Sequence, residues 1–139
     1  MTKNTTYEYN EGSAKCIINY NGFDFIGVAK CHPEDEDMES ERVGMTIAET
    51  RASIKVISFI RDYEVKPQLK ILNHLYSNMR RSKYYNPNSY EAKMLRSQIR
   101  VIEKELATIN NQIADERKFV KDYIDGKDKL YQRLRAKNQ

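Results

Sequence analysis

The sequence is poor in the residues that introduce turns into a chain. It has five glycines and three prolines among 139 residues, about half of their ordinary combined share. No apolar run approaches the roughly 20 residues of a membrane span, and the N-terminal stretch MTKNTTYEYN lacks the apolar core of a secretory signal. With only two cysteines, Cys16 and Cys31, a disulfide-rich secreted framework is excluded. We therefore expect a soluble cytoplasmic protein built mainly from long helices.

Recognisable catalytic patterns are also missing. The chain has no P-loop, GxGxxG, HExxH or GxSxG motif, and His32 and His74 are its only histidines. Cys16, Cys31 and His32 are of metal-ligating types but lack a regular ligand spacing, so buried, unliganded cysteines are expected. Many of the acidic residues lie in a charge run with nothing to separate their pKa values. The sequence predicts a protein that is not an enzyme and holds no metal or cofactor.

Charge is unevenly distributed along the chain. Lys and Arg number 24 against 20 for Asp and Glu, which gives a net charge of +4. Residues 34–41, EDEDMESE, hold six of the acids, so the rest of the chain has 24 bases against 14 acids. A basic body attracts phosphates of nucleic acid or of a small nucleotide, although a solvated coiled coil rich in lysine explains it equally well. We expect the acidic run to form a solvated loop before a helix with Ser40 as its N-cap.

The N-terminal part, residues 1–33, has the pattern of a small antiparallel sheet. Asn21-Gly22 separates two apolar stretches, and this dipeptide adopts the two positive φ angles of the type I′ turn that joins paired strands. Tyr7 and Tyr9 alternate with polar residues, which predicts an additional edge strand. Because so small a sheet cannot bury a core alone, helices or another subunit must cover it.

Two long helical regions are expected after the sheet, over residues 41–81 and 90–137. The first is apolar on more than one face and should pack against two neighbours. Pro67 should break or kink it, because proline lacks an amide hydrogen and crowds the preceding turn. Residues 82–89 form the connector, in which Asn-Pro-Asn favours a turn and Ser89 can cap the next helix.

The second helical region carries a regular heptad pattern. Steps of four and three fall mostly on apolar residues: Leu95, Ile99, Ile102, Leu106, Ile109, Ile113, Glu116, Val120, Tyr123, Lys127, Leu130 and Leu134. A seam sustained over this length favours coiled-coil packing, with the preceding helix folded back as a hairpin and another subunit as partners. The predicted fold is α+β, a single domain in which a small antiparallel sheet precedes a long helical hairpin with coiled-coil packing, and the protein is oligomeric.

Residues 75–90 combine aromatic, amide and cationic side chains at the corner where the two helical regions meet. They include four tyrosines, three cations and three asparagines. Aromatic rings stack on bases, amides read adenine edges, and Arg or Lys binds phosphate. The alternative is that the tyrosines pack the corner and the cations are solvated. On the first helix, Arg51 and Lys55 lie four residues apart and can face one way, so that copies around a symmetry axis would form a ring of positive charge.

Several segments resemble the first Thoeris anti-defence family of phage proteins. They are the N-terminal hairpin, AKCHPED at residues 29–35, GMTIAETRASIK at 44–55, and SKYYN at 82–86 followed by SYE at 89–91. The resemblance covers nearly the whole chain. It implies a non-enzymatic sponge that binds glycocyclic ADP-ribose, which Thoeris TIR-domain proteins make from NAD, and so keeps an NAD-depleting effector inactive. It also implies a hexamer built from dimers, in the cytoplasm of the infected bacterial host, with separate sites for cyclic oligonucleotides.

The resemblance also implies which residues bind. A ring-stacking aromatic matches Tyr76 or the pair Tyr84 and Tyr85, a nucleotide-reading amide matches Asn86, and an arginine for cyclic oligonucleotides matches Arg51. The predicted cyclic ADP-ribose site comprises Tyr76, Met79, Arg80, Lys83, Tyr84, Tyr85 and Asn86. The predicted cyclic oligonucleotide site comprises Arg51 and Lys55, and we predict no catalytic or metal-binding residue.

Two other functions stay open at this point. One is a nucleic-acid-binding coiled-coil protein, favoured by cations on the final helix such as Arg96, Arg100 and Arg133, although such charges also solubilise a heptad seam. The other is a structural coiled-coil adaptor whose helices only assemble a larger particle. The sponge remains the first hypothesis, with small nucleotides as ligands and neither nucleic acid nor membrane as partner.

Overall fold

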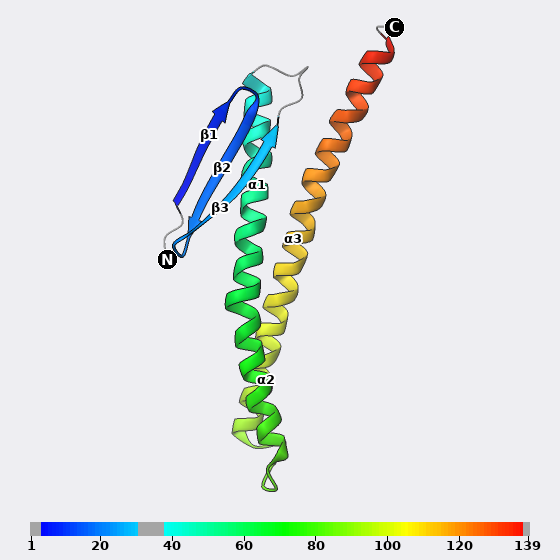
Figure 1. Cartoon of the computed structure of the whole chain (residues 1–139). Coiled ribbons are helices and arrows are strands. Elements are labelled where there is room, and N and C mark those ends of the chain that lie inside the picture. Colours follow the sequence, from blue (N-terminus) through cyan, green and yellow to red (C-terminus); the bar gives the residue numbers. More distant parts are fainter. Residues whose placement is uncertain (1–3, 31–37, 138–139) are drawn as a thin grey trace. The chain divides into compact units, whose positions relative to one another are not determined.

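The computed structural model describes residues 4–30 and 38–137. Three strands, β1 (Asn4–Asn10), β2 (Ser13–Tyr20) and β3 (Phe23–Lys30), precede the helix α1 (Met38–Ile60), the π-helical turn η1 (Arg61–Val65), α2 (Lys66–Arg81) and α3 (Tyr90–Lys137) (Figure 1). This confirms the predicted α+β class, a three-stranded antiparallel sheet followed by long helices. The chain divides into two compact units, residues 1–56 with 113–139 and residues 57–112, so α1 and α3 each contribute to both.

The sheet is built from two consecutive hairpins in the order β1-β2-β3. Asn21 and Gly22 have φ of 54° and 82°, and Tyr20 pairs with Phe23, which confirms the predicted turn. The other hairpin turns at Glu11 and Gly12, whose φ values are also positive at 49° and 79°. The edge strand expected around Tyr7 and Tyr9 is β1.

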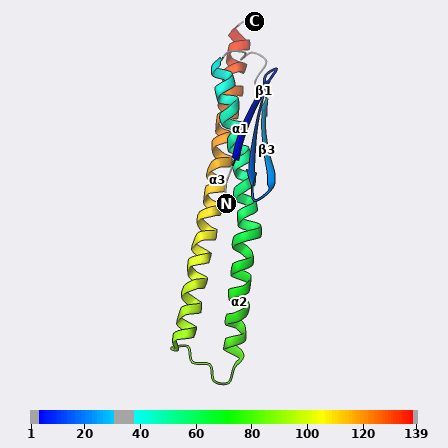
Figure 2. The same cartoon turned by 90° about the vertical axis from the view of Figure 1, so that its left-hand side faces the viewer.

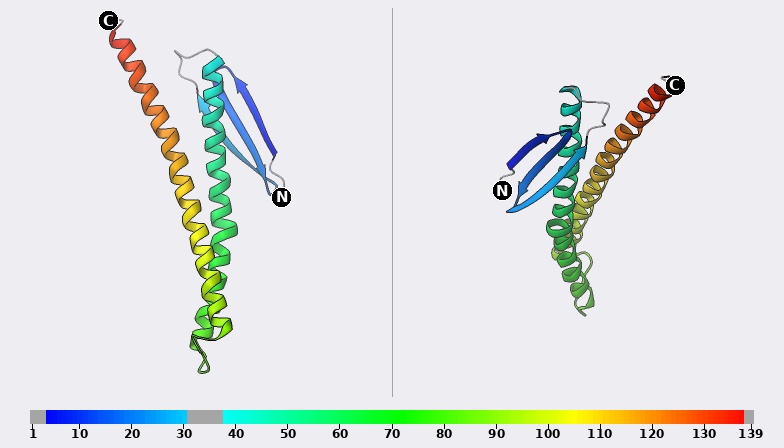
Figure 3. Two further views of the ribbon diagram at one scale, coloured as in Figure 1. Left: turned by 180° about the vertical axis from the view of Figure 1, so that it is seen from behind. Right: turned by 45° about the horizontal axis from the view of Figure 1, so that its top comes forward.

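The first unit packs α1 against one face of this sheet, as the views from front and back show (Figures 1 and 3). Alternate residues of β2 are buried, which is the period-two pattern of a strand covered on one side. On β3, Gly27 lies against the α1 backbone at Ala48 and Ala52, where a Cβ atom would overlap main-chain atoms. Both alanines are fully buried, so small residues on both elements allow the close approach.

The start of the first helical region differs from expectation, and its middle has a π-helical turn where a break or a kink was expected. Helix α1 begins at Met38, so Ser40 lies inside the helix and the prediction that it is the N-cap is wrong. Pro67 does not break the helix, which continues from η1 into α2 with the proline in the first turn of α2. The proline ring crowds the carbonyl four residues earlier, that of Tyr63, and the wider π-helical turn at that point relieves the crowding. The expected acidic loop, with Cys31 and His32, lies outside the described residues over positions 31–37.

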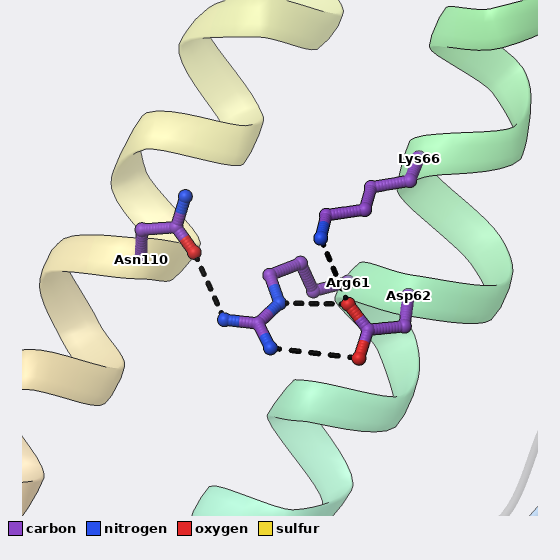
Figure 4. A network of polar contacts seen from close by, with 4 residues as sticks. All are labelled: Arg61, Asp62, Lys66 and Asn110. Atoms are coloured by element: carbon purple, nitrogen blue, oxygen red, sulfur yellow. Dashed lines mark hydrogen bonds and ion pairs between the residues drawn. The ribbon is translucent and has the colours of Figure 1, made fainter.

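The second unit is a hairpin of α2 and the first part of α3, closed by residues 82–89 (Figure 2). Ser89 Oγ accepts a hydrogen bond of 3.2 Å from the Ala92 amide, which confirms the predicted cap. At the other end, Arg61 Nη1 donates to Asn110 Oδ1 at 3.1 Å and Arg61 Nε to Asp62 Oδ1 at 2.9 Å (Figure 4). The hydrogen bond from Arg61 lowers the pKa of Asp62, and the network ties the π-helical turn to α3.

Burial along α3 follows the heptad pattern. From Leu95 to Tyr123 every seam residue is buried or half-buried, and Ile99, Ile113 and Val120 are the most deeply buried of them. Apolar residues off the seam, such as Val101, are exposed instead. The side chains of Lys127, Leu130 and Leu134 lie outside the described set. Within the described part of the chain, no helix is both long and apolar enough to cross a membrane.

Candidate functional site

Four side chains meet at the closed end of the helical hairpin and are called here the tyrosine cluster: Tyr76, Arg80, Tyr85 and Arg96. The hydroxyls of Tyr76 and Tyr85 are 3.1 Å apart, and their ring centroids are 6.5 Å apart. The Arg80 guanidinium carbon lies 5.9 Å from the centre of the Tyr76 ring, within cation–π distance. The cluster therefore joins α2, the connector and α3 with two rings and two permanent positive charges.

Arg96, on α3, connects the parts of the cluster by hydrogen bonds. Arg96 Nη1 donates to the Tyr76 hydroxyl at 3.4 Å, and its Nη2 donates to the Pro87 carbonyl at 2.6 Å, so one guanidinium holds both a ring and the connector. Hydrogen bonds from Tyr85 and then Arg96 lower the pKa of Tyr76, whereas the bond to Tyr76 raises the pKa of Tyr85. At 3.1 Å either tyrosine hydroxyl can donate to the other, and the Tyr76 oxygen also accepts from Arg96. Two guanidinium groups next to two aromatic rings have the chemistry that an anion with an aromatic base requires.

The remaining residues of the predicted cyclic ADP-ribose site are neighbours of the cluster in sequence, and Lys83, Tyr84 and Asn86 make contacts with residues outside it. Tyr84 is 80% exposed, and Lys83 Nζ lies 5.1 Å from the centre of its ring. Asn86 Oδ1 accepts from the Asn88 amide at 2.9 Å, which leaves both hydrogens of its NH₂ group to donate elsewhere. Met79 is half-buried in the last turn of α2.

Sequence reasoning did not place Arg96 in this site. It was counted only among the cations of the final helix, because it is 20 residues from Tyr76 and no local spacing relates the two. The one available indication was its position next to Leu95 at the start of the seam, which places it near the connector in any hairpin of these helices.

Arg51 and Lys55, the two residues of the predicted second site, lie in the first unit and line a cavity of about 610 Å³. Arg51 Nη1 donates to the Val28 carbonyl at 2.7 Å, and Lys55 Nζ donates to the Ile26 carbonyl at 2.6 Å. Arg117, on α3, adds a third cation. This β3-edge cavity is lined by Ile26, Gly27, Val28, Arg51, Ile54, Lys55, Arg117 and Val120.

The chemistry of the β3-edge cavity is cationic and apolar together. Its three charged lining residues, Arg51, Lys55 and Arg117, are all basic, and the rest of its lining is apolar. Arg51 and Lys55 each give one hydrogen to a strand carbonyl, but a guanidinium carries five donors and an ammonium three. Donors thus remain for an anion that also has an apolar or aromatic part. Arg117 was missed in the sequence because its neighbourhood depends on how α3 packs in the first unit.

A metal centre has no support in the described part of the chain, where no three His, Cys, Asp or Glu side chains come together as possible ligands. Cys16 is fully buried opposite Tyr7, and burial raises the pKa of its thiol, which makes it unreactive.

Comparison with known proteins adds no assignment, because no protein-family model, no curated protein and no solved structure matches this chain significantly.

Proposed function

We propose that this protein is a phage anti-defence sponge that binds and retains cyclic ADP-ribose signals of the Thoeris system without cleaving them. The observation that carries the proposal is the tyrosine cluster, where two rings and two guanidinium groups meet. Asn86, the residue after Tyr85, keeps the hydrogens of its side-chain NH₂ group to donate elsewhere. Such a ligand presents an adenine and a pyrophosphate, which call for stacking surfaces and cations. Retention requires no general base. The sequence resemblance supports the same choice of ligand.

Aromatic stacking would bind the base of the ligand, and cationic side chains would bind its phosphates. The exposed ring of Tyr84, or Tyr76 after rearrangement of its bond to Tyr85, offers a face to the base, worth roughly 1–3 kcal/mol. Arg80 and Lys83 lie over tyrosine rings and can turn toward phosphate oxygens, to which charge-assisted hydrogen bonds are strong. Arg96 holds the ring and the connector in place.

The experiment is retention followed by release. The protein is incubated with cyclic ADP-ribose isomers, filtered and heat-denatured, and the released nucleotide is identified. A sponge returns the intact ligand, whereas a nucleic-acid-binding protein or a structural adaptor returns none.

Tyr76→Ala should weaken retention by about tenfold or more, and Asn86→Arg should weaken it further by filling the site. Tyr63→Ala, which removes a tyrosine that is 70% exposed in η1, is the matched control and should retain the ligand fully. Wild-type retention in a Tyr76→Ala, Asn86→Arg double variant would show that the pocket is elsewhere.

We propose the β3-edge cavity as a separate site for cyclic oligonucleotide signals, with Arg51 and Lys55 as binding residues. Arg51→Ala should abolish this binding and spare the cyclic ADP-ribose isomers, but it also removes a contact to β3. Arg117→Ala avoids that problem because Arg117 is exposed, and the neighbouring exposed Lys118 supplies the control Lys118→Ala. We expect weaker cyclic oligonucleotide binding only for Arg117→Ala. Equal weakening by both variants would indicate general charge attraction and contradict a site in this cavity.

We also propose that the protein is a homo-hexamer in which α3 takes part in coiled-coil packing between subunits. The proposal is supported by exposed apolar side chains on the second unit. Ile71 and Val101 are more than 60% exposed, and they line an apolar groove of about 440 Å³ together with Leu72 and Ile102. Light scattering tests the assembly, and a stable monomer across the micromolar range would contradict it.

A further inference from the structure

The two edges of the sheet differ in how their outward backbone groups are used. In a hairpin with a two-residue turn, the two residues that flank the turn exchange backbone hydrogen bonds with each other. Hydrogen-bonded and non-hydrogen-bonded residue pairs then alternate along the two strands, and the backbone groups of the non-bonded pairs face away from the partner strand. With Asn10 opposite Ser13 and Tyr20 opposite Phe23, the outward-facing groups are those of Thr5, Tyr7 and Tyr9 on β1, and those of Asp24, Ile26, Val28 and Lys30 on β3.

The β3 edge is occupied by side chains of its own chain. Arg51 and Lys55 donate to the carbonyls of Val28 and Ile26, both of which face outward by this register. Charged side chains over an edge block the addition of another strand. The β3 edge is therefore closed to a pairing partner.

The β1 edge has the character of a strand that accepts a partner. Six of its seven residues, all but Tyr9, are exposed, and its sequence NTTYEYN has no proline or lysine to prevent pairing. Its one charge, Glu8, lies 4.0 Å from Lys15 on β2, so the strand carries little net charge. Tyr7 is 49% exposed although its side chain shares the covered face of the sheet with Cys16.

We propose that β1 pairs antiparallel with β1 of a second copy of this chain, about a two-fold axis at Tyr7, to give a continuous six-stranded sheet. This register pairs Asn4 with the partner's Asn10 and so uses the whole strand. Thr5, Tyr7 and Tyr9 face the partner's Tyr9, Tyr7 and Thr5 as hydrogen-bonded pairs, each exchanging two backbone bonds.

The side chains favour this register over its neighbours. Shifting the axis to Glu8 would place two carboxylates opposite each other, which is unfavourable, and shifting it to Thr6 would shorten the paired length. With the axis at Tyr7, Glu8 faces the partner's Thr6, and the two Tyr7 rings lie side by side on the face that α1 covers. The half-exposed Tyr7 ring then becomes buried, which is favourable. This interface is independent of the nucleotide-binding function and of the α3 seam.

A proline placed at an outward amide tests the pairing without removing a bond inside the sheet. The Thr5 amide faces outward, and proline is tolerated at such positions of edge strands. We expect Thr5→Pro to raise the concentration at which the assembly dissociates by about tenfold or more and to lower the mass seen by light scattering, with an unchanged circular dichroism spectrum. Thr5→Ala keeps the amide hydrogen and should behave as wild type. An assembly of wild-type mass and stability in Thr5→Pro would overturn the proposal.

Amide hydrogen exchange of the wild-type protein is a second test, which does not require that a variant folds. The amides of Thr5 and Tyr7 should be protected in the assembly and lose protection on dilution. The outward amides of Ile26 and Val28 should not respond to concentration. Self-pairing would be contradicted by a monomer throughout the micromolar range. It would also be contradicted if the Thr5 and Tyr7 amides of an oligomer exchanged as fast as unprotected amides, because this edge would then be open to some other chain.

Discussion

Gly27 is the residue at which the contact between sheet and α1 leaves the least room. Its partner across the sheet, Cys16, is fully buried, and the α1 backbone at Ala48 and Ala52 occupies the space where a side chain would begin. Because the obstacle is backbone rather than a flexible side chain, a methyl group here forces the helix and the strand apart. Interiors at this packing density accommodate such shifts only at a cost.

Gly27→Ala should lower the free energy of unfolding by about 1–3 kcal/mol or more, measured by chemical denaturation. Gly126→Ala is the matched control, since the added carbon meets nothing within 4 Å and Gly126 lies in the interior of α3. Alanine stabilises a helix interior by about 0.5–1 kcal/mol relative to glycine. Equal effects of the two substitutions would contradict the close packing of β3 on α1.

Tyr7 should make stability depend on pH at the alkaline end. Burial, and then the charge and hydrogen bond of Glu49, raise the pKa of Tyr7 above its ordinary 10.0. The folded state therefore holds this proton more tightly than the unfolded state. The resulting stability is fully present below about pH 10 and is lost as pH rises through the raised pKa. Tyr7→Phe should flatten this part of the profile, which urea unfolding from about pH 8 to about pH 11 measures. Parallel profiles for the two proteins would contradict the Tyr7–Glu49 interaction.

At the scale of elements, the sequence predicted what depends on local chemistry. Asn21-Gly22 identified one hairpin because both residues adopt positive φ readily. The turn at Glu11-Gly12 has the same geometry but was not singled out, since glutamate rarely adopts it. The start of α1 and the π-helical turn at η1 were also missed. Pro67 indicates a disturbance of the helix around it, but not that the disturbance is a π-helical turn. The Arg61–Asn110 contact that accompanies the turn joins residues 49 positions apart, which no local pattern relates.

For the candidate sites too, local sequence predicted some residues, whereas others depend on long-range packing. Tyr76, Arg80 and Tyr85 lie within ten residues of one another, so their composition alone suggested a cluster. Arg96 and Arg117 reach their sites through long-range contacts, which depend on how α3 packs. A heptad pattern predicts which face of α3 is apolar but not which cations end beside a ring or a strand edge.

Ser89 provides the element-scale prediction, because its hydroxyl satisfies an amide in the first turn of α3 that has no partner within the helix. Ser89→Ala should cost about 1 kcal/mol of unfolding free energy, measured by thermal or chemical denaturation. Ser97→Ala, at an exposed position inside α3, should be neutral or slightly stabilising because alanine favours the helix interior. Equal losses from both would indicate that the cap contributes nothing.

At the scale of the whole molecule, exposed apolar surface is the feature that one chain alone does not explain. Seam residues of α3 are buried or half-buried up to Tyr123, yet Ile71, Val101 and Phe119 are at least half exposed. Scattered apolar residues on a surface are ordinary, but Ile71 and Val101 line one groove. Contiguous apolar surface marks places where protein partners bind, and a second copy of the chain is the proposed partner.

Ile109→Asp tests that assembly through the seam. Ile109 is half-buried at a heptad position of α3, so an aspartate there places a charge in an apolar layer, which is costly without a partner. We expect a smaller mass by light scattering together with helical content close to wild type by circular dichroism. Asn111→Asp adds the same charge two residues away at an exposed position and should leave the mass unchanged. Loss of helix along with mass in Ile109→Asp would mean that the residue supports the hairpin itself. An unchanged mass in both variants would contradict a subunit interface on the α3 seam, while the β1 edge would remain testable through Thr5→Pro.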